Sequence, residues 1–191
     1  MRLPILKDDP EVCEVRQRAE RQIEALDVSI SCEAGCTACC RHLVPLAPAE
    51  WRRLGELLDR LDAADSAGVA KRWDRLWEQL EAAGISELLL ELADDPHAVP
   101  HDGRLWLASA YRRAGVDCPF LVEGLCTIYD ERPLACRLHL STRPPAECRA
   151  DGGGGDIRLP GPPPVAEWAA RSGGHWKPLV ALRRPMMANI G

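Results

Sequence analysis

The sequence predicts a mainly α-helical fold for this chain of 191 residues. In several segments apolar residues recur at three- and four-residue steps, which is the period of a helix with one buried face. Almost nothing alternates with the period of two that a half-buried strand needs. With 46% hydrophobic residues, the chain can bury a sizeable core, so we expect a single domain over residues 1–191.

The helical periodicity is concentrated in the first two thirds of the chain. In order, the periodic segments are residues 10–27, 49–62, 67–83, 86–93 and 104–114. Pro10 suits the first turn of the first helix, and Gly84 suits the C-terminal cap of the third. Pro96 and Pro100 separate the last two segments. Residues 49–115 are therefore expected to form a helical insert.

The last third of the chain has weaker signals. Short structured pieces are expected at residues 126–130 and 134–140. Residues 143–164 are rich in proline and contain four consecutive glycines, a composition typical of a flexible loop. Helical stretches are expected in the tail, at residues 165–171 and 176–183.

Eight of the nine cysteines fall into two groups in segments without periodicity. The groups are Cys32, Cys36, Cys39 and Cys40, then Cys118, Cys126, Cys136 and Cys148. The apolar runs are too short for a signal peptide or a bilayer span, so we expect a cytoplasmic protein with no membrane partner. Thiols stay reduced there, and densely grouped reduced cysteines are typical of metal ligands. The full prediction is a small helical domain with a cysteine-rich metal centre held in irregular loops between helices.

The adjacent pair Cys39 and Cys40 indicates how the two groups are used. Neighbouring side chains point in different directions on a strand or a helix, so this pair does not readily bind one ion. A site made by the first group alone is thus disfavoured, and we expect segments 32–40 and 118–148 to meet in space. Eight thiolates match two four-coordinate ions or one polynuclear cluster. Cys148 is the least secure ligand because it adjoins the proline-rich loop.

The metal is less clearly indicated than its ligands, because tetrahedral sulfur suits zinc and iron–sulfur clusters alike. Cys118-Pro119 matches the Cys-Pro step of a bacterial ferredoxin motif, although the full ferredoxin spacing is absent. Zinc ribbons carry closely paired cysteines, whereas the second group is spaced by seven, nine and eleven intervening residues. We therefore favour an iron–sulfur cluster slightly over zinc.

The residues around the cysteines resemble a known family. The matching stretches are Cys118-Pro-Phe-Leu, Gly124-Leu-Cys126-Thr-Ile128-Tyr129, and Arg132-Pro-Leu-Ala-Cys136-Arg137, preceded by Cys32-x3-Cys36-x2-Cys39-Cys40. This pattern resembles the YkgJ-type cysteine-cluster family, which is described as zinc- or iron-chelating and is often labelled as Fe–S oxidoreductases. The resemblance covers about residues 32–40 and 118–148, and the helices between lie outside it.

That resemblance implies metal ligation by the cysteines of both groups. The ligands that it implies are Cys32, Cys36, Cys39, Cys40, Cys118, Cys126 and Cys136, with Cys148 matched less closely. A related cysteine cluster occurs in flagellin lysine N-methylases, which implies an accessory role in protein-lysine methyl transfer as an alternative. The chain shows no methyl-donor site of its own.

Several residues near the cysteines have a physical interpretation that does not depend on the family. Cations close to clustered thiolates offset their negative charge, and the candidates are Arg41, Arg132 and Arg137. Solvated surface arginines are an equally good interpretation of all three. An apolar lid that excludes water from the metal is expected from Phe120, Ile128 and Tyr129, although ordinary packing explains them as well.

The remaining cysteine and four of the histidines are not favoured as metal ligands. Cys13 lies alone on the first helix and is interpreted as a small buried apolar residue. His42 and His139 stand within three residues of cysteines and are alternative nitrogen ligands, but eight thiolates already satisfy the coordination count. His97 and His101 have Pro100 between them, which disfavours a regular helical pair.

The function is expected to depend on the metal centre. The net charge of −5 argues against nucleic acid as a partner, and no nucleotide-binding, serine-nucleophile or zinc-protease motif is present. One hypothesis is an iron–sulfur redox protein or metallo-enzyme component with a protein electron donor. A second is a structural zinc module that binds a partner protein, and a third is a metal chaperone or sensor with exchangeable metal.

Overall fold

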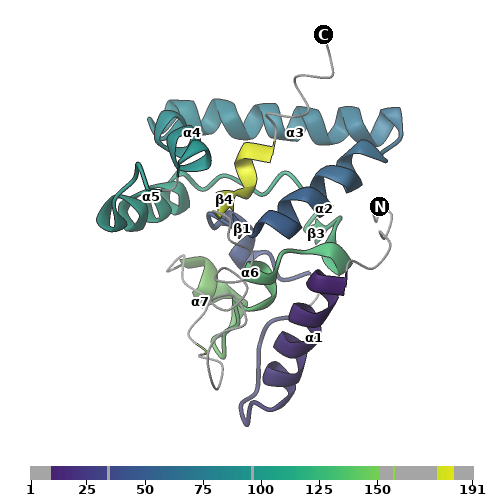
Figure 1. Ribbon diagram of the computed structural model, residues 1–191. Coiled ribbons are helices and arrows are strands. Elements are labelled where there is room, and N and C mark those ends of the chain that lie inside the picture. Colours follow the sequence, from purple (N-terminus) through teal and green to yellow (C-terminus); the bar gives the residue numbers. More distant parts are fainter. Residues whose placement is uncertain (1–9, 34, 96, 151–156, 158–175, 183–191) are drawn as a thin grey trace.

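The computed structural model describes residues 10–33, 35–95, 97–150, 157 and 176–182. Over these residues the protein is mainly helical, as the sequence predicts (Figure 1). The α-helices are α1 (Pro10–Glu24), α2 (Pro48–Asp59), α3 (Ala63–Ala82), α4 (Ser86–Asp94), α5 (His101–Ala114), α6 (Leu134–Arg137) and α7 (Pro145–Ala150). Short 3-10 helices are η1 (Ala38–Arg41), η2 (Tyr129–Glu131) and η3 (Leu179–Leu182).

Local capping explains where the predicted helices begin and end. Helix α3 begins at Ala63 rather than at residue 67, because the Asp62 side chain accepts a hydrogen bond from the Asp65 amide at 2.8 Å. At its other end Gly84 has a φ of +68°, the left-handed conformation that terminates many helices. Helix α5 ends in the same way at Gly115.

Two predictions for the last third of the chain are only partly right. The loop expected at 143–164 contains α7, whose first residue is Pro145, and proline is well tolerated in a first helical turn. The helix expected at 176–183 is reduced to the 3-10 helix η3, which strand β4 (Lys177–Pro178) precedes. The rest of that loop, apart from residue 157, and the helix expected at 165–171 lie outside the described residues.

The strands described are two residues long and form two antiparallel pairs. Strand β1 (Pro45–Leu46) pairs with β4, so that Pro45 lies opposite Pro178. Strands β2 (Leu121–Val122) and β3 (Leu125–Cys126) form a hairpin. Its turn residues Glu123 and Gly124 have φ values of +50° and +78°, as a tight two-residue hairpin turn requires.

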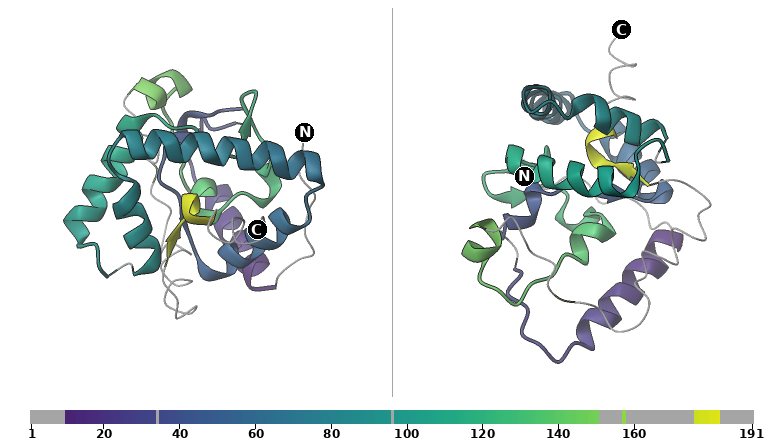
Figure 2. Two further views of the ribbon diagram at one scale, coloured as in Figure 1. Left: turned by 90° about the horizontal axis from the view of Figure 1, so that it is seen from above. Right: turned by 90° about the vertical axis from the view of Figure 1, so that its left-hand side faces the viewer.

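The larger core lies between α2, α3, α4, α5 and η3. Trp73 of α3 packs edge-on against Phe120 with ring centroids 5.5 Å apart, and its indole nitrogen donates a hydrogen bond to the carbonyl of Val180 at 2.8 Å. A smaller core joins α1 to the start of α2 and to α6 through Val12, Ala47 and Leu134. Helices α1 and α3 lie on opposite sides of the molecule, with β1 and α6 between them (Figures 1 and 2).

No helix among the described residues is both long enough and apolar enough to cross a bilayer.

Candidate metal centre

The first cysteine group leads into η1. Gly35 has a φ of +93° and the amide of Cys36 donates a hydrogen bond to the carbonyl of Glu33, so the chain turns just before η1. Cys39 and Cys40 lie within η1 itself. The expected absence of long periodic structure in this group is confirmed, and a single 3-10 turn carries the adjacent pair.

The second group is distributed over one loop and three separate elements. Cys118 follows α5, Cys126 lies on β3, Cys136 on α6 and Cys148 on α7. The amide of Cys118 donates a 2.9 Å hydrogen bond to the carbonyl of Cys40, which joins the two groups directly. Helix α7 also packs against η1. The two segments therefore meet in space, as the adjacent cysteines predict.

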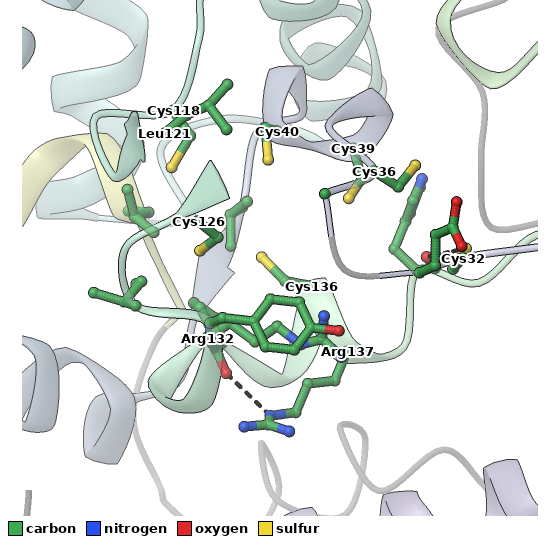
Figure 3. Close-up of a pocket in the computed structure, with 18 of the residues that line it drawn as sticks. Cys32, Cys36, Cys39, Cys40, Cys118, Leu121, Cys126, Arg132, Cys136 and Arg137 are labelled. Atoms are coloured by element: carbon green, nitrogen blue, oxygen red, sulfur yellow. Dashed lines mark hydrogen bonds between the residues drawn. The ribbon is translucent and has the colours of Figure 1, made fainter. Parts of the chain in front are cut away.

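Seven of the eight cysteines line one cavity of about 120 Å³. They are Cys32, Cys36, Cys39, Cys40, Cys118, Cys126 and Cys136. Figure 3 shows that the sulfurs of Cys40, Cys118, Cys126 and Cys136 project toward a common space from different elements, while Cys32 lies at its edge. The donors thus come from both groups, and neither group encloses this cavity alone.

Cys148 is not among the described residues that line this cavity, but it lies close to one that does. Its sulfur is buried and lies 3.3 Å from the hydroxyl oxygen of Ser141. The Ser141 amide in turn lies 3.3 Å from the sulfur of Cys32. Ser141 therefore contacts both Cys148 and Cys32.

All nine cysteines are free thiols. Within the described part of the chain, no group of three or more His, Cys, Asp or Glu side chains could hold a metal ion as now placed. A metal centre built from these cysteines would therefore draw their sulfurs closer together, which is usual where metal binding is coupled to ordering.

The thiols differ in how readily they lose a proton. A hydrogen bond with Cys40 lowers the pKa of Cys39 to about 7 and raises the pKa of Cys40. Burial raises the pKa of Cys118 to about 12 and places that of Cys136 well above its ordinary value. Metals bind the thiolate form, so loading this site releases protons.

The comparison with protein families agrees with this arrangement. Residues 31–151 match a family model, CxxCxxCC, whose description reads "Putative zinc- or iron-chelating domain". The chain belongs to the CxxCxxCC family. The match runs continuously from the first cysteine group to just past Cys148 and includes α2 to α5, which the resemblance in the sequence left outside. No curated protein and no solved structure matches the chain.

The arginines near the cysteines of this CxxCxxCC protein are not equivalent. Arg132 lines the cavity, and its guanidinium carbon lies 4.0 Å from the centre of the Tyr129 ring, a stacking that holds the cation there. Arg137 also lines it and donates a hydrogen bond to the carbonyl of Arg132 at 3.2 Å. Arg41 instead forms a 2.8 Å ion pair with Asp117 at the surface.

The expected apolar lid is formed only in part. Ile128 and Tyr129 line the cavity, as do other apolar residues such as Leu121 and Leu179. Phe120 is fully buried in the larger core against Trp73, so ordinary packing is the correct interpretation of that residue.

The sequence interpretation missed a buried ionic network behind the cysteine loops. Glu131 of η2, only 4% exposed, accepts hydrogen bonds from Arg53 of α2 at 2.7 and 2.8 Å and from Arg16 of α1 at 3.1 Å. The network fixes η2, which lies between Cys126 and Cys136. No local signal reveals it, because its three members are far apart in the chain.

Glu50 is a second buried carboxylate that the sequence does not reveal. It lies near the start of α2, and its two oxygens accept hydrogen bonds from the amides of Ala47 at 3.1 Å and Leu134 at 2.5 Å. Burial raises the pKa of Glu50 despite these bonds. Glu50 thereby ties the start of α2 to the first residue of α6, which carries Cys136.

Proposed function

We propose that this CxxCxxCC domain holds a polynuclear metal centre in the cysteine-lined cavity, and that the centre is an iron–sulfur cluster serving a redox or metallo-enzyme role. The observation that carries the proposal is that seven thiols from both groups line one cavity of about 120 Å³. A single tetrahedral ion takes four thiolates. Seven donors exceed that number and suffice for two ions, or for one iron–sulfur cluster held by four cysteines with further thiols beside it.

The size of the cavity supports the same conclusion. A cavity needs only about 10–15 Å³ to admit one water molecule. The space between the sulfurs is several times larger, as a group of several inorganic atoms requires. Thiolate-only donor sets fit iron–sulfur clusters and zinc alike, so the residues present fit both.

The residues around the sulfurs favour a redox role over a purely structural one. When bound, an iron–sulfur cluster supplies one-electron transfer at a potential set by its surroundings. Arg132 places a positive charge beside two of the thiols. It adds to the hydrogen bond with Cys40 in lowering the pKa of Cys39, and it opposes the burial that raises the pKa of Cys126. Ile128 and Leu179 limit the access of water. Charge and burial of this kind are what tune the potential of a cluster.

Such a centre would need a protein electron donor, and we place the protein in the cytoplasm, where its thiols stay reduced.

The test is to purify the protein without oxygen, then measure its metal content, absorption spectrum and EPR spectrum. We expect iron, sulfide and sulfur-to-iron charge-transfer absorbance. Colourless protein that holds about two zinc ions and no iron after anaerobic reconstitution would contradict the redox proposal and favour a structural zinc module.

A further inference from the structure

Two histidines repeat one spacing relative to the two cysteine groups. His42 follows Cys39 with two residues between, and His139 follows Cys136 with the same spacing. The pattern Cys-x2-His therefore occurs once in each group. It involves the first member of the adjacent cysteine pair, Cys39, and not the second.

Local backbone structure brings each histidine beside its cysteine. Cys39 lies in η1, and His42 is the residue that directly follows η1, with an extended backbone. The amide of His42 donates a hydrogen bond to the carbonyl of Cys39 at 3.2 Å. Cys136 lies in α6, which ends at Arg137, and His139 is the second residue beyond that helix.

The fold then places the two Cys-x2-His turns against each other. The rings of His42 and His139 meet edge to face, with their centroids 4.4 Å apart. Both Nε2 atoms are buried from solvent. The bond from the Leu134 amide to Glu50 holds the start of α6 against α2, and α6 packs on β1, which follows His42 closely in the chain.

The four side chains share a second, smaller cavity of about 100 Å³. Its described lining is Cys39, His42, Cys136 and His139 together with the apolar residues Leu43, Val44, Pro45 and Ala135. Two thiols and two imidazoles are the donor set of a tetrahedral Cys2His2 zinc site. The apolar remainder supplies the dry surroundings in which such ligands hold a metal firmly.

We propose that Cys39, His42, Cys136 and His139 form a Cys2His2 position for a divalent metal ion of the zinc type, next to the large cavity. Cys39 and Cys136 line both cavities, and here they serve the smaller one. Five thiols then remain for the large cavity, which still exceeds the four that one tetrahedral ion or one iron–sulfur cluster takes, namely Cys32, Cys36, Cys40, Cys118 and Cys126.

This assignment of the thiols to two cavities explains why the sequence places two cysteines side by side. Neighbouring side chains diverge, so Cys39 turns to the Cys2His2 position while Cys40, bonded through its carbonyl to Cys118, serves the large cavity. The four donors need to close together around the ion, as metal-coupled sites commonly do. The inference rests on the proposed function in that both centres draw on one set of cysteines.

The first experiment uses the wild-type protein loaded with zinc alone. X-ray absorption at the zinc edge distinguishes imidazole from thiolate ligands, and cadmium-113 NMR of the cadmium-loaded protein does so independently. We expect mixed nitrogen and sulfur coordination in both measurements. Bound metal with sulfur ligands only would overturn this inference and leave the proposed function standing. A wild-type protein that binds no metal would overturn both.

The second experiment compares two double variants. His42→Ala with His139→Ala is expected to lose about one equivalent of zinc per chain and all imidazole scattering. The control, His97→Ala with His101→Ala, removes two exposed histidines and should retain the wild-type metal content. Unchanged zinc content and spectrum in the first variant would overturn the inference.

A third variant guards against loss of zinc through misfolding. His42→Cys keeps a metal-binding side chain at the same place. Unlike the double alanine variant, it should therefore bind the full equivalent of zinc, with an absorption spectrum shifted toward sulfur ligation. Failure of His42→Cys to restore zinc in protein whose circular dichroism matches wild type would count against the site.

Discussion

Replacing Glu131 by glutamine tests whether the buried ionic network holds the cysteine loops in place. Glutamine has the same shape but lacks the charge, and it turns one acceptor into a donor that faces the guanidinium groups of Arg53 and Arg16. Breaking a buried pair from one side costs about 3–5 kcal/mol. One oxygen remains and Arg16 is partly exposed, so we expect about 3 kcal/mol, near the lower limit of that range.

The assay is chemical and thermal unfolding of the reduced, metal-loaded protein. A loss of about 3 kcal/mol corresponds to a fall in Tm of roughly 6–12 °C for a chain of this size. Glu56→Gln is the matched control, because Glu56 is an exposed residue of the same helix as Arg53 and should change stability by less than about 0.5 kcal/mol. Equal unfolding free energies for the Glu131 and Glu56 variants would refute the reasoning.

The pH dependence of the same variant has a definite sign. Burial alone would raise the pKa of Glu131, but the hydrogen bonds and charges of Arg53 and Arg16 outweigh it and lower the pKa. A lowered carboxyl pKa stabilises the fold above the unfolded value of about 4.3, and this stabilisation is lost as the pH falls through the folded-state pKa. The difference in unfolding free energy between wild type and Glu131→Gln should therefore become smaller as the pH falls. A difference that grows at low pH would contradict a lowered pKa of Glu131.

Two further predictions concern the metal and the larger core. Cys40→Ser should lower the metal content measured by elemental analysis, whereas Cys13→Ser on α1 should leave it unchanged, and equal losses would count against the ligand assignment. Trp73→Phe removes the hydrogen bond to the Val180 carbonyl and some buried ring, so it should cost about 1–3 kcal/mol in thermal unfolding. Trp106→Phe, at an exposed position of α5, should cost less than about 0.5 kcal/mol.

The sequence predicts the long helices well because their stability depends on a local, periodic pattern. The apolar stripe of α3 recurs with helical spacing, and its end at Gly84 follows from the conformational freedom of glycine. Prediction from the sequence fails for β4, because its two residues become a strand only by pairing with β1, which is far away in the chain. Pairing of this kind leaves no local periodicity to detect.

In the candidate site, too, the sequence predicts features that depend on neighbouring residues and misses those that depend on distant ones. The divergence of Cys39 and Cys40 is a local property, and it suffices to predict that two cysteine groups converge. The bond between Arg16 and Glu131 joins residues 115 positions apart, so composition and spacing give no indication of it. The shared cavity of His42 and His139 likewise depends on how α6 packs on β1.

The matched family segment, residues 31–151, is smaller than the unit that packs together. Helix α1 lies upstream of it and supplies Arg16 to Glu131, while η3 lies downstream and fills the larger core with Leu179 and Val180. We expect a fragment trimmed to the family boundaries to expose that apolar surface and to precipitate on expression. Weak metal binding by such a fragment would then reflect the loss of α1 and η3 and not a weakness of the cysteine ligands themselves.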